Sequence, residues 1–85
     1  MKILIIGESG LGKSNISDII RNGIFKADSN ACITVNDPSR EVKELGAGDN
    51  KYVIDVLHDG ENVGDYDIVV NVKTKAFIDR FKELY

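Results

Sequence analysis

The sequence predicts a single α/β domain over residues 1–85, with about four mainly parallel strands and flanking helices. Three observations lead to this fold class. The chain opens with a short apolar run that leads directly into a glycine-rich turn, and a helical pattern follows the turn. Strand-like and helix-like patterns then alternate to the end of the chain, which is typical of a mostly parallel sheet. With 85 residues and 42% hydrophobic content, the chain is long enough for one core.

The first strand and the first helix have clear local signals. KILII at 2–6 has four successive apolar residues after its lysine, most of them β-branched, as expected for a strand that is covered on both faces. Residues 14–22 predict a helix, because three isoleucines recur at helical spacing. Asn22-Gly23 is a suitable C-terminal stop.

The middle of the chain continues the alternation. ACITV at 31–35 predicts a second strand, and PSREVKEL at 38–45 predicts a short helix with Pro38 in its first turn. KYVIDVL at 51–57 and YDIVVNV at 66–72 predict a third and a fourth strand.

The connection between the last two predicted strands leaves their relative direction open. HDGENVGD has eight residues, whereas a parallel crossover usually needs about a dozen or more. The last strand is therefore either parallel, with an almost extended connection, or antiparallel in a hairpin. KAFIDRFKELY at 75–85 predicts a closing helix, because its apolar residues share one side.

Composition excludes several classes of partner. With 14 acidic and 11 basic residues the net charge is −3, so the chain has no general attraction for nucleic acid. No apolar run approaches the roughly 20 residues of a membrane span. Cys32 is the only cysteine and cannot form an internal disulfide. We therefore expect a cytoplasmic protein that binds neither nucleic acid nor membrane.

The glycine-rich turn carries the strongest chemical signal. Residues 7–14, GESGLGKS, match the phosphate-binding pattern G-x-x-x-x-G-K-[ST] at every fixed position. Glycines let the main chain wrap closely around an anion, so that N–H groups and the positive end of the following helix face it. Lys13 would add a positive charge at the β- and γ-phosphates, and the Ser14 hydroxyl would be a ligand for Mg²⁺.

Together with the strand before it, this turn resembles the first strand and Walker A loop of the P-loop NTPase superfamily. The resemblance is specific for residues 2–20, about a quarter of the chain. It implies a three-layer P-loop-type domain with the first strand central, and a nucleoside triphosphate, ATP or GTP, bound with Mg²⁺. The positions that it assigns to nucleotide binding are Gly7, Ser9, Gly10, Leu11, Gly12, Lys13 and Ser14.

Phosphoryl chemistry also needs an acid near Mg²⁺, which members of the superfamily place at the end of an apolar strand. Asp55, Asp59 and Asp37 compete for this role. Asp55 is the first choice, because it lies within an otherwise apolar strand, and a charged side chain is rarely buried there without a partner such as a metal ion. We therefore expect Lys13 and Asp55 as catalytic groups, and Ser14 and Asp55 as metal ligands.

Other groups that hydrolysis would need are less clearly marked. Arg40 and Arg21 are candidates for neutralising charge on the phosphates, and His58 is a candidate for proton transfer.

Three functions remain open at this point. The first is a small nucleotide-binding protein with slow or partner-dependent hydrolysis, ATP being favoured because no guanine-reading motif is visible. The second is an interaction or inhibitor protein that uses a P-loop scaffold without catalysis and contacts a protein partner through its acidic 55–67 region. The third is a compact nucleotide or small-molecule kinase whose site is completed by self-association.

Overall fold

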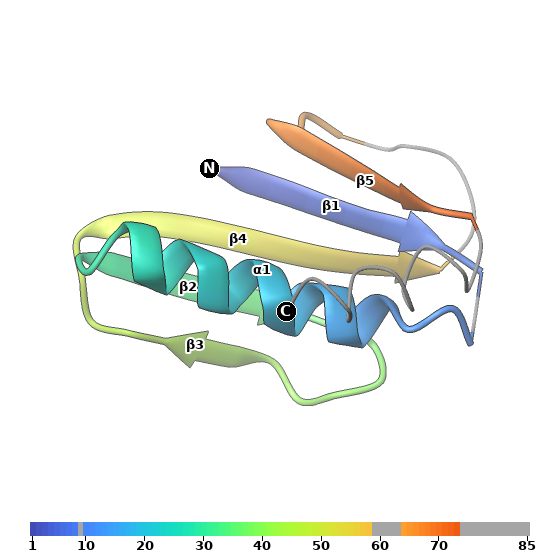
Figure 1. The fold of residues 1–85 in the computed structure, drawn as a ribbon, viewed down its shortest axis with the longest axis horizontal. Coiled ribbons are helices and arrows are strands. Elements are labelled where there is room, and N and C mark those ends of the chain that lie inside the picture. The colour runs from blue at the N-terminus through green and yellow to red at the C-terminus, as the bar shows by residue number, and fades with distance from the viewer. Residues whose placement is uncertain (9, 59–63, 74–85) are drawn as a thin grey trace.

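The computed structural model describes residues 1–8, 10–58 and 64–73 of the chain. These residues form one mixed, mostly parallel sheet of five strands and one helix (Figure 1). In chain order the elements are β1 (Lys2–Gly7), α1 (Lys13–Ala27), β2 (Ala31–Asn36), β3 (Lys43–Leu45), β4 (Asn50–His58) and β5 (Ile68–Val72).

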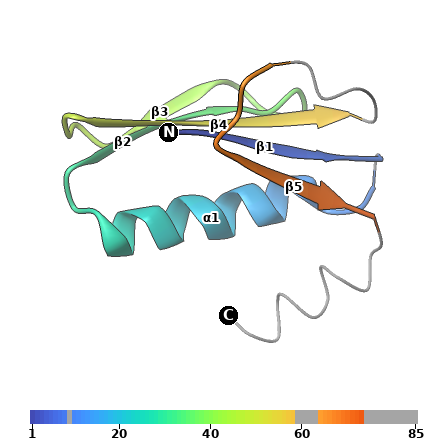
Figure 2. The same cartoon turned by 90° about the horizontal axis from the view of Figure 1, so that it is seen from above.

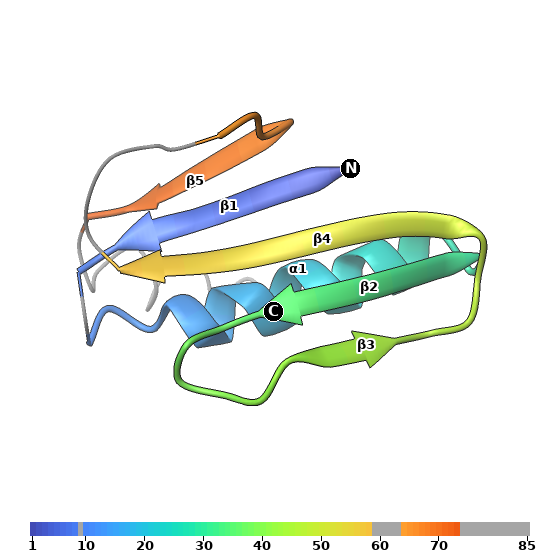
Figure 3. The same ribbon diagram turned by 180° about the vertical axis from the view of Figure 1, so that it is seen from behind.

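Four of the five strands are parallel, and their order places β1 inside the sheet. The order is β3-β2-β4-β1-β5, as Figure 3 shows from behind. β1 pairs in parallel with β4 on one side and with β5 on the other, and only β3 is antiparallel to its neighbour. The four predicted strands are confirmed. The direction of the last one is also decided, because β5 runs parallel to β1.

The core lies between the sheet and α1. Side chains of a strand alternate between the two faces, and the residues that point toward α1 are apolar on every parallel strand. The buried cluster consists of Ile3, Ile5, Ile16, Ala31, Ile33, Ile54, Val56 and Val72. Ile16 is the contribution of α1 and is only 1% exposed. The apolar run within the predicted strand at 2–6 is explained by the interior position of β1, whose residues Ile3–Ile6 are all buried, whereas Lys2 is exposed.

The other face of the sheet is covered differently. Figure 2 shows α1 on one side and the segment that leads into β5 on the opposite side. Tyr66 in that segment donates a hydrogen bond of 2.7 Å to Asp55 of β4. In the described part of the chain only one face therefore carries a helix, so the predicted three-layer arrangement is present only in part. The predicted closing helix at 75–85 lies outside the described residues.

The helix α1 is longer than the sequence predicts. It begins at Lys13 and continues through Asn22-Gly23 to Ala27. Ile24 and Phe25, beyond the expected stop, pack against the core cluster. A glycine inside a helix costs about 1 kcal/mol. The burial of two large apolar side chains, each worth about 1.5–3 kcal/mol when complete, outweighs that cost.

The predicted helix over 38–45 is wrong. Lys43–Leu45 instead form β3, which pairs with the outer edge of β2 through Ile33↔Leu45 and Val35↔Lys43. The helical pattern was weak, since Val42 and Leu45 are its only large apolar residues. Pairing β3 with β2 satisfies backbone groups that an open sheet edge would leave without partners. This tertiary gain overrides the local propensity.

No helix in the described part of the chain has the length and apolar character that a membrane crossing requires.

Candidate functional site

The glycine-rich turn joins the carboxyl end of β1 to the start of α1. Gly10 and Gly12 have φ angles of 82° and 81°, a left-handed conformation that other residues rarely adopt. Gly12 occupies the N-cap of α1, so no side chain caps the helix, and the first turn contains no acidic residue. No acidic side chain of its own first turn therefore neutralises the positive end of this 15-residue helix, and its main-chain N–H groups are suited to an external anion.

Lys13 is buried at this point, with only 8% of its surface exposed. Its Nζ donates hydrogen bonds to the main-chain oxygens of Gly7 and Glu8, the latter over 3.0 Å. Among the described residues no carboxylate lies within ion-pair distance of this ammonium group. A buried charge without a counter-ion is costly, so an anion bound in the loop would compensate it.

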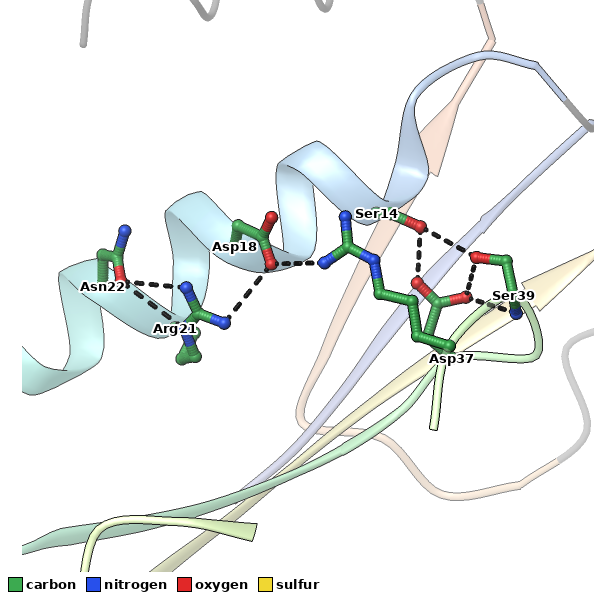
Figure 4. A network of polar contacts seen from close by, with 7 residues as sticks. Ser14, Asp18, Arg21, Asn22, Asp37 and Ser39 are labelled. Atoms are coloured by element: carbon green, nitrogen blue, oxygen red, sulfur yellow. Dashed lines mark hydrogen bonds and ion pairs between the residues drawn. The ribbon is translucent and has the colours of Figure 1, made fainter. Parts of the chain in front are cut away.

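Ser14, one residue further, meets the end of β2. Its Oγ donates a hydrogen bond of 2.5 Å to Oδ2 of Asp37, as Figure 4 shows. Asp37 is 5% exposed and immediately follows β2. It continues the alternation of Ile33 and Val35, which point into the core toward α1. This alternation directs its carboxylate to the start of the helix.

The carboxylate of Asp37 is also held by Ser39. Oδ1 accepts hydrogen bonds from the Ser39 main-chain N–H at 2.9 Å and from its hydroxyl at 2.8 Å. Burial by itself would raise the pKa of Asp37, but the hydrogen bonds from Ser14 and Ser39 and the charge of Arg40 outweigh it. The pKa therefore lies below its ordinary value, so that Asp37 is ionised at neutral pH.

These groups surround one cleft of about 430 Å³ at the carboxyl edge of the sheet. His58, the last residue of β4, is exposed and also lines the cleft. The full lining consists of Gly10, Gly12, Lys13, Ser14, Asn15, Asp37, Pro38, Ser39, Val56 and His58. The cleft thus combines a cationic end at Lys13 with the oxygens of Ser14, Asp37 and Ser39.

Asp55, the first choice from the sequence, lies elsewhere. Its neighbours Ile54 and Val56 point into the core, so its own side chain points to the face opposite α1. There it accepts hydrogen bonds of 2.7 Å from Asn36 Nδ2 and from the Tyr66 hydroxyl. The bond to Asp55 raises the pKa of Tyr66 above its ordinary value. The structure brings Asp37 to Ser14 and does not bring Asp55 there.

The two arginines considered for phosphate binding are both engaged by α1. Asp18 forms an ion pair of 2.9 Å with Arg40 and one of 3.4 Å with Arg21. Figure 4 shows Asp18 on the helix, reached by Arg21 from the next turn. Both guanidinium groups are thereby held by a carboxylate on the flank of α1.

The remaining predicted loop residues also have structural roles. Leu11 packs against the core cluster. At Gly7, an added Cβ would lie 2.5 Å from the main-chain oxygen of Val72, so β5 approaches too closely for a side chain. Ser9 and Asp59 lie outside the described residues.

Ser39 is the residue that sequence reasoning missed. The available signal was its position two residues after an aspartate in a Pro-containing turn, where such an Asp commonly accepts a hydrogen bond from the main chain. For Asp37, the signal was its spacing along the chain: it follows Ile33 and Val35 at intervals of two residues, so its side chain points to the same face of the sheet as theirs.

Comparisons with protein-family models, with curated proteins and with solved structures found no match to this chain. The fold itself is a small α/β domain with a mixed, mostly parallel five-strand sheet.

Proposed function

We propose that the chain binds a nucleoside triphosphate, ATP by preference, together with Mg²⁺ in the cleft at the start of α1. The observation that carries the proposal is Lys13, a buried ammonium group whose partners in the described residues are two main-chain oxygens. A triphosphate would supply a negative charge that the described residues do not place beside this ammonium group. Kinship with the P-loop NTPase superfamily, including its three-layer form, is part of this proposal.

Each group in the cleft has a role in this binding. The uncapped start of α1 and the loop amides would face the phosphates, and Lys13 would lie against the β- and γ-phosphate oxygens. Ser14 and Asp37 would hold the metal, so Asp37 takes the role for which the sequence favoured Asp55. When bound, Mg²⁺ supplies charge neutralisation at the phosphates.

The donor set fits Mg²⁺ in particular. Among the described residues, no three His, Cys, Asp or Glu side chains gather into a ready-made metal cage. Mg²⁺ usually keeps several waters and uses one or two protein oxygens together with substrate phosphates. One carboxylate and one hydroxyl at the mouth of a phosphate loop meet that description.

Hydrolysis, where it occurs, is expected to be slow or dependent on a partner. Arg21 and Arg40 are each paired with Asp18 on the flank of α1, and neither belongs to the residues that line the cleft, so neither is placed to neutralise charge on the phosphates. Among the described residues that line the cleft, His58 would be the group for orienting a water or moving a proton. A partner that supplied an arginine would accelerate the reaction.

Isothermal titration of the whole chain with ATP tests the proposal, in Mg²⁺ and again with the metal chelated. We expect a saturable, Mg²⁺-dependent isotherm, with GTP weaker than ATP. An absence of binding up to millimolar MgATP would contradict the proposed function.

A further inference from the structure

Ser39 holds one of the two oxygens of the Asp37 carboxylate. Both donors of Ser39, the main-chain N–H and the hydroxyl, go to Oδ1 of Asp37 at 2.9 and 2.8 Å. The other oxygen, Oδ2, is directed at Ser14 (Figure 4). The two carboxylate oxygens therefore have different surroundings, because one is bound to the turn and the other faces the cleft.

This asymmetry limits how the carboxylate can meet a cation. A metal ion in the cleft would meet Oδ2, which accepts the hydrogen bond of the Ser14 hydroxyl. It would have to displace both Ser39 donors to reach Oδ1 as well. The Ser39 hydroxyl is also 3.3 Å from that of Ser14, so the three side chains form one connected group. Asp37 is thus prearranged to offer a single oxygen.

A single carboxylate oxygen suits small divalent cations better than large ones. Mg²⁺ requires near-octahedral geometry with short bonds of about 2.0–2.1 Å, and it retains water in the other positions. Ca²⁺ takes about 6–8 oxygen ligands at longer distances and commonly uses a carboxylate through both oxygens. A site in which Oδ1 is already hydrogen-bonded elsewhere therefore lowers the affinity for Ca²⁺ more than the affinity for Mg²⁺.

We infer that Ser39 is a positioning residue that makes the nucleotide site selective for Mg²⁺ over Ca²⁺, by keeping Oδ1 of Asp37 out of the metal's reach. The inference rests on the proposed function, since it concerns the metal that accompanies the nucleotide. Ser39 acts through Asp37 and need not touch the metal or the nucleotide.

The test compares the affinity of four proteins for two metal complexes of ATP. Isothermal titration gives Kd for MgATP and for CaATP with wild type, Ser39→Ala, Ser39→Thr and Ser29→Ala, each at saturating metal. Ser39→Thr retains the hydroxyl. Ser29→Ala removes an exposed hydroxyl from the turn between α1 and β2, at the opposite end of the sheet. Circular dichroism verifies that each variant is folded.

We expect wild type to bind MgATP at least about tenfold more tightly than CaATP. Ser39→Ala should lower this ratio by about tenfold, the value of one hydrogen bond to a charged group. Ser39→Thr and Ser29→Ala should keep the wild-type ratio. A merely structural role of Ser39 in the turn would weaken both complexes equally and leave the ratio unchanged.

The outcomes separate the two proposals. If wild type binds MgATP and CaATP equally well, or if Ser39→Ala binds MgATP with an unchanged ratio, the inference about Ser39 is wrong while the proposed function stands. If wild type binds neither complex, the proposed function is wrong and the inference falls with it.

Discussion

Asp37 and Asp55 lie on opposite faces of the same sheet, one register position apart. Asn36 of β2 is the direct partner of Asp55 on β4, so Asp37, the next residue, points the other way. Asp37 meets Ser14 of α1, and Asp55 meets Tyr66 on the far face. The two carboxylates therefore have separable roles, one in the cleft and one in holding the segment that leads into β5.

Exchanging each carboxylate for its amide should separate these roles. Asp37→Asn is expected to weaken Mg²⁺-dependent ATP binding by about 10–100-fold, the usual effect of losing a group that supports a metal site. Asp55→Asn should leave binding intact and lower the free energy of unfolding by about 1 kcal/mol, because a charged hydrogen-bond acceptor is lost. Isothermal titration and urea unfolding measure the two effects. The reverse assignment, with binding lost only in Asp55→Asn, would contradict our placement of the metal.

Lys13 should be required for binding but not for folding. Replacing it by Met keeps an unbranched side chain of nearly the same length and removes a buried charge without a counter-ion among the described residues. We expect ATP binding to weaken by about 100-fold or more, while the free energy of unfolding stays within about 1 kcal/mol of wild type or rises. The control is Lys51→Met, because Lys51 is exposed on β4 away from the cleft. Loss of both folding and binding in Lys13→Met would argue for a purely structural lysine.

Two glycine substitutions should change stability in opposite directions. A methyl group at Gly7 would meet the Val72 main-chain oxygen at 2.5 Å, so Gly7→Ala should destabilise the fold by about 1–3 kcal/mol through overpacking between β1 and β5. At Gly23, inside α1, a Cβ would have nothing within 4 Å. Gly23→Ala should therefore stabilise by about 0.5–1 kcal/mol. Urea unfolding gives the free energy of unfolding of both variants. Equal changes in Gly7→Ala and Gly23→Ala would contradict the close approach of β5 to Gly7.

Asp28 should make stability depend on acid pH. Located just after α1, it accepts hydrogen bonds from Asn50 Nδ2 at 2.9 Å, from the Tyr52 hydroxyl at 2.8 Å and from the Asn30 N–H at 2.9 Å. These bonds, that of Asn50 foremost, hold its pKa below the ordinary value of 3.8. A pKa lowered by folding stabilises the protein fully above the unfolded-state pKa, and this contribution disappears as the pH falls through the folded-state pKa.

The matching measurement is urea unfolding of wild type and Asp28→Asn from about pH 6 to about pH 2. Near pH 6, wild type should have the larger free energy of unfolding of the two proteins. The difference between their free energies should shrink below about pH 4 as Asp28 takes up a proton. The control is Asp49→Asn, whose carboxylate accepts no hydrogen bond from the described residues. A difference that does not change with pH would show that the ionised form of Asp28 is not what stabilises the fold.

Local patterns in the sequence were sufficient for most elements. The apolar run at 2–6, the helical spacing after Lys13 and the three later apolar runs all became the expected elements. The positive φ angles at Gly10 and Gly12 agree with the glycines that the loop pattern requires. These features depend on side-chain periodicity and on backbone freedom, which neighbouring residues set among themselves.

The edge strand β3 could not be predicted in this way. Its residues have little preference of their own, and they become a strand because the outer edge of β2 offers backbone partners. The continuation of α1 past Gly23 has a similar origin, since the sheet provides the apolar surface that Ile24 and Phe25 cover.

The sequence by itself determined a strand, a glycine turn with Lys13 and Ser14, and a helix, because these are consequences of local chain chemistry. Only the tertiary structure decided that Asp37 meets that turn and that Asp55 faces away from it. The physical reason is that a strand directs successive side chains to opposite faces. Which face carries the helix depends on strand order and register, and both arise from contacts between residues distant in the chain.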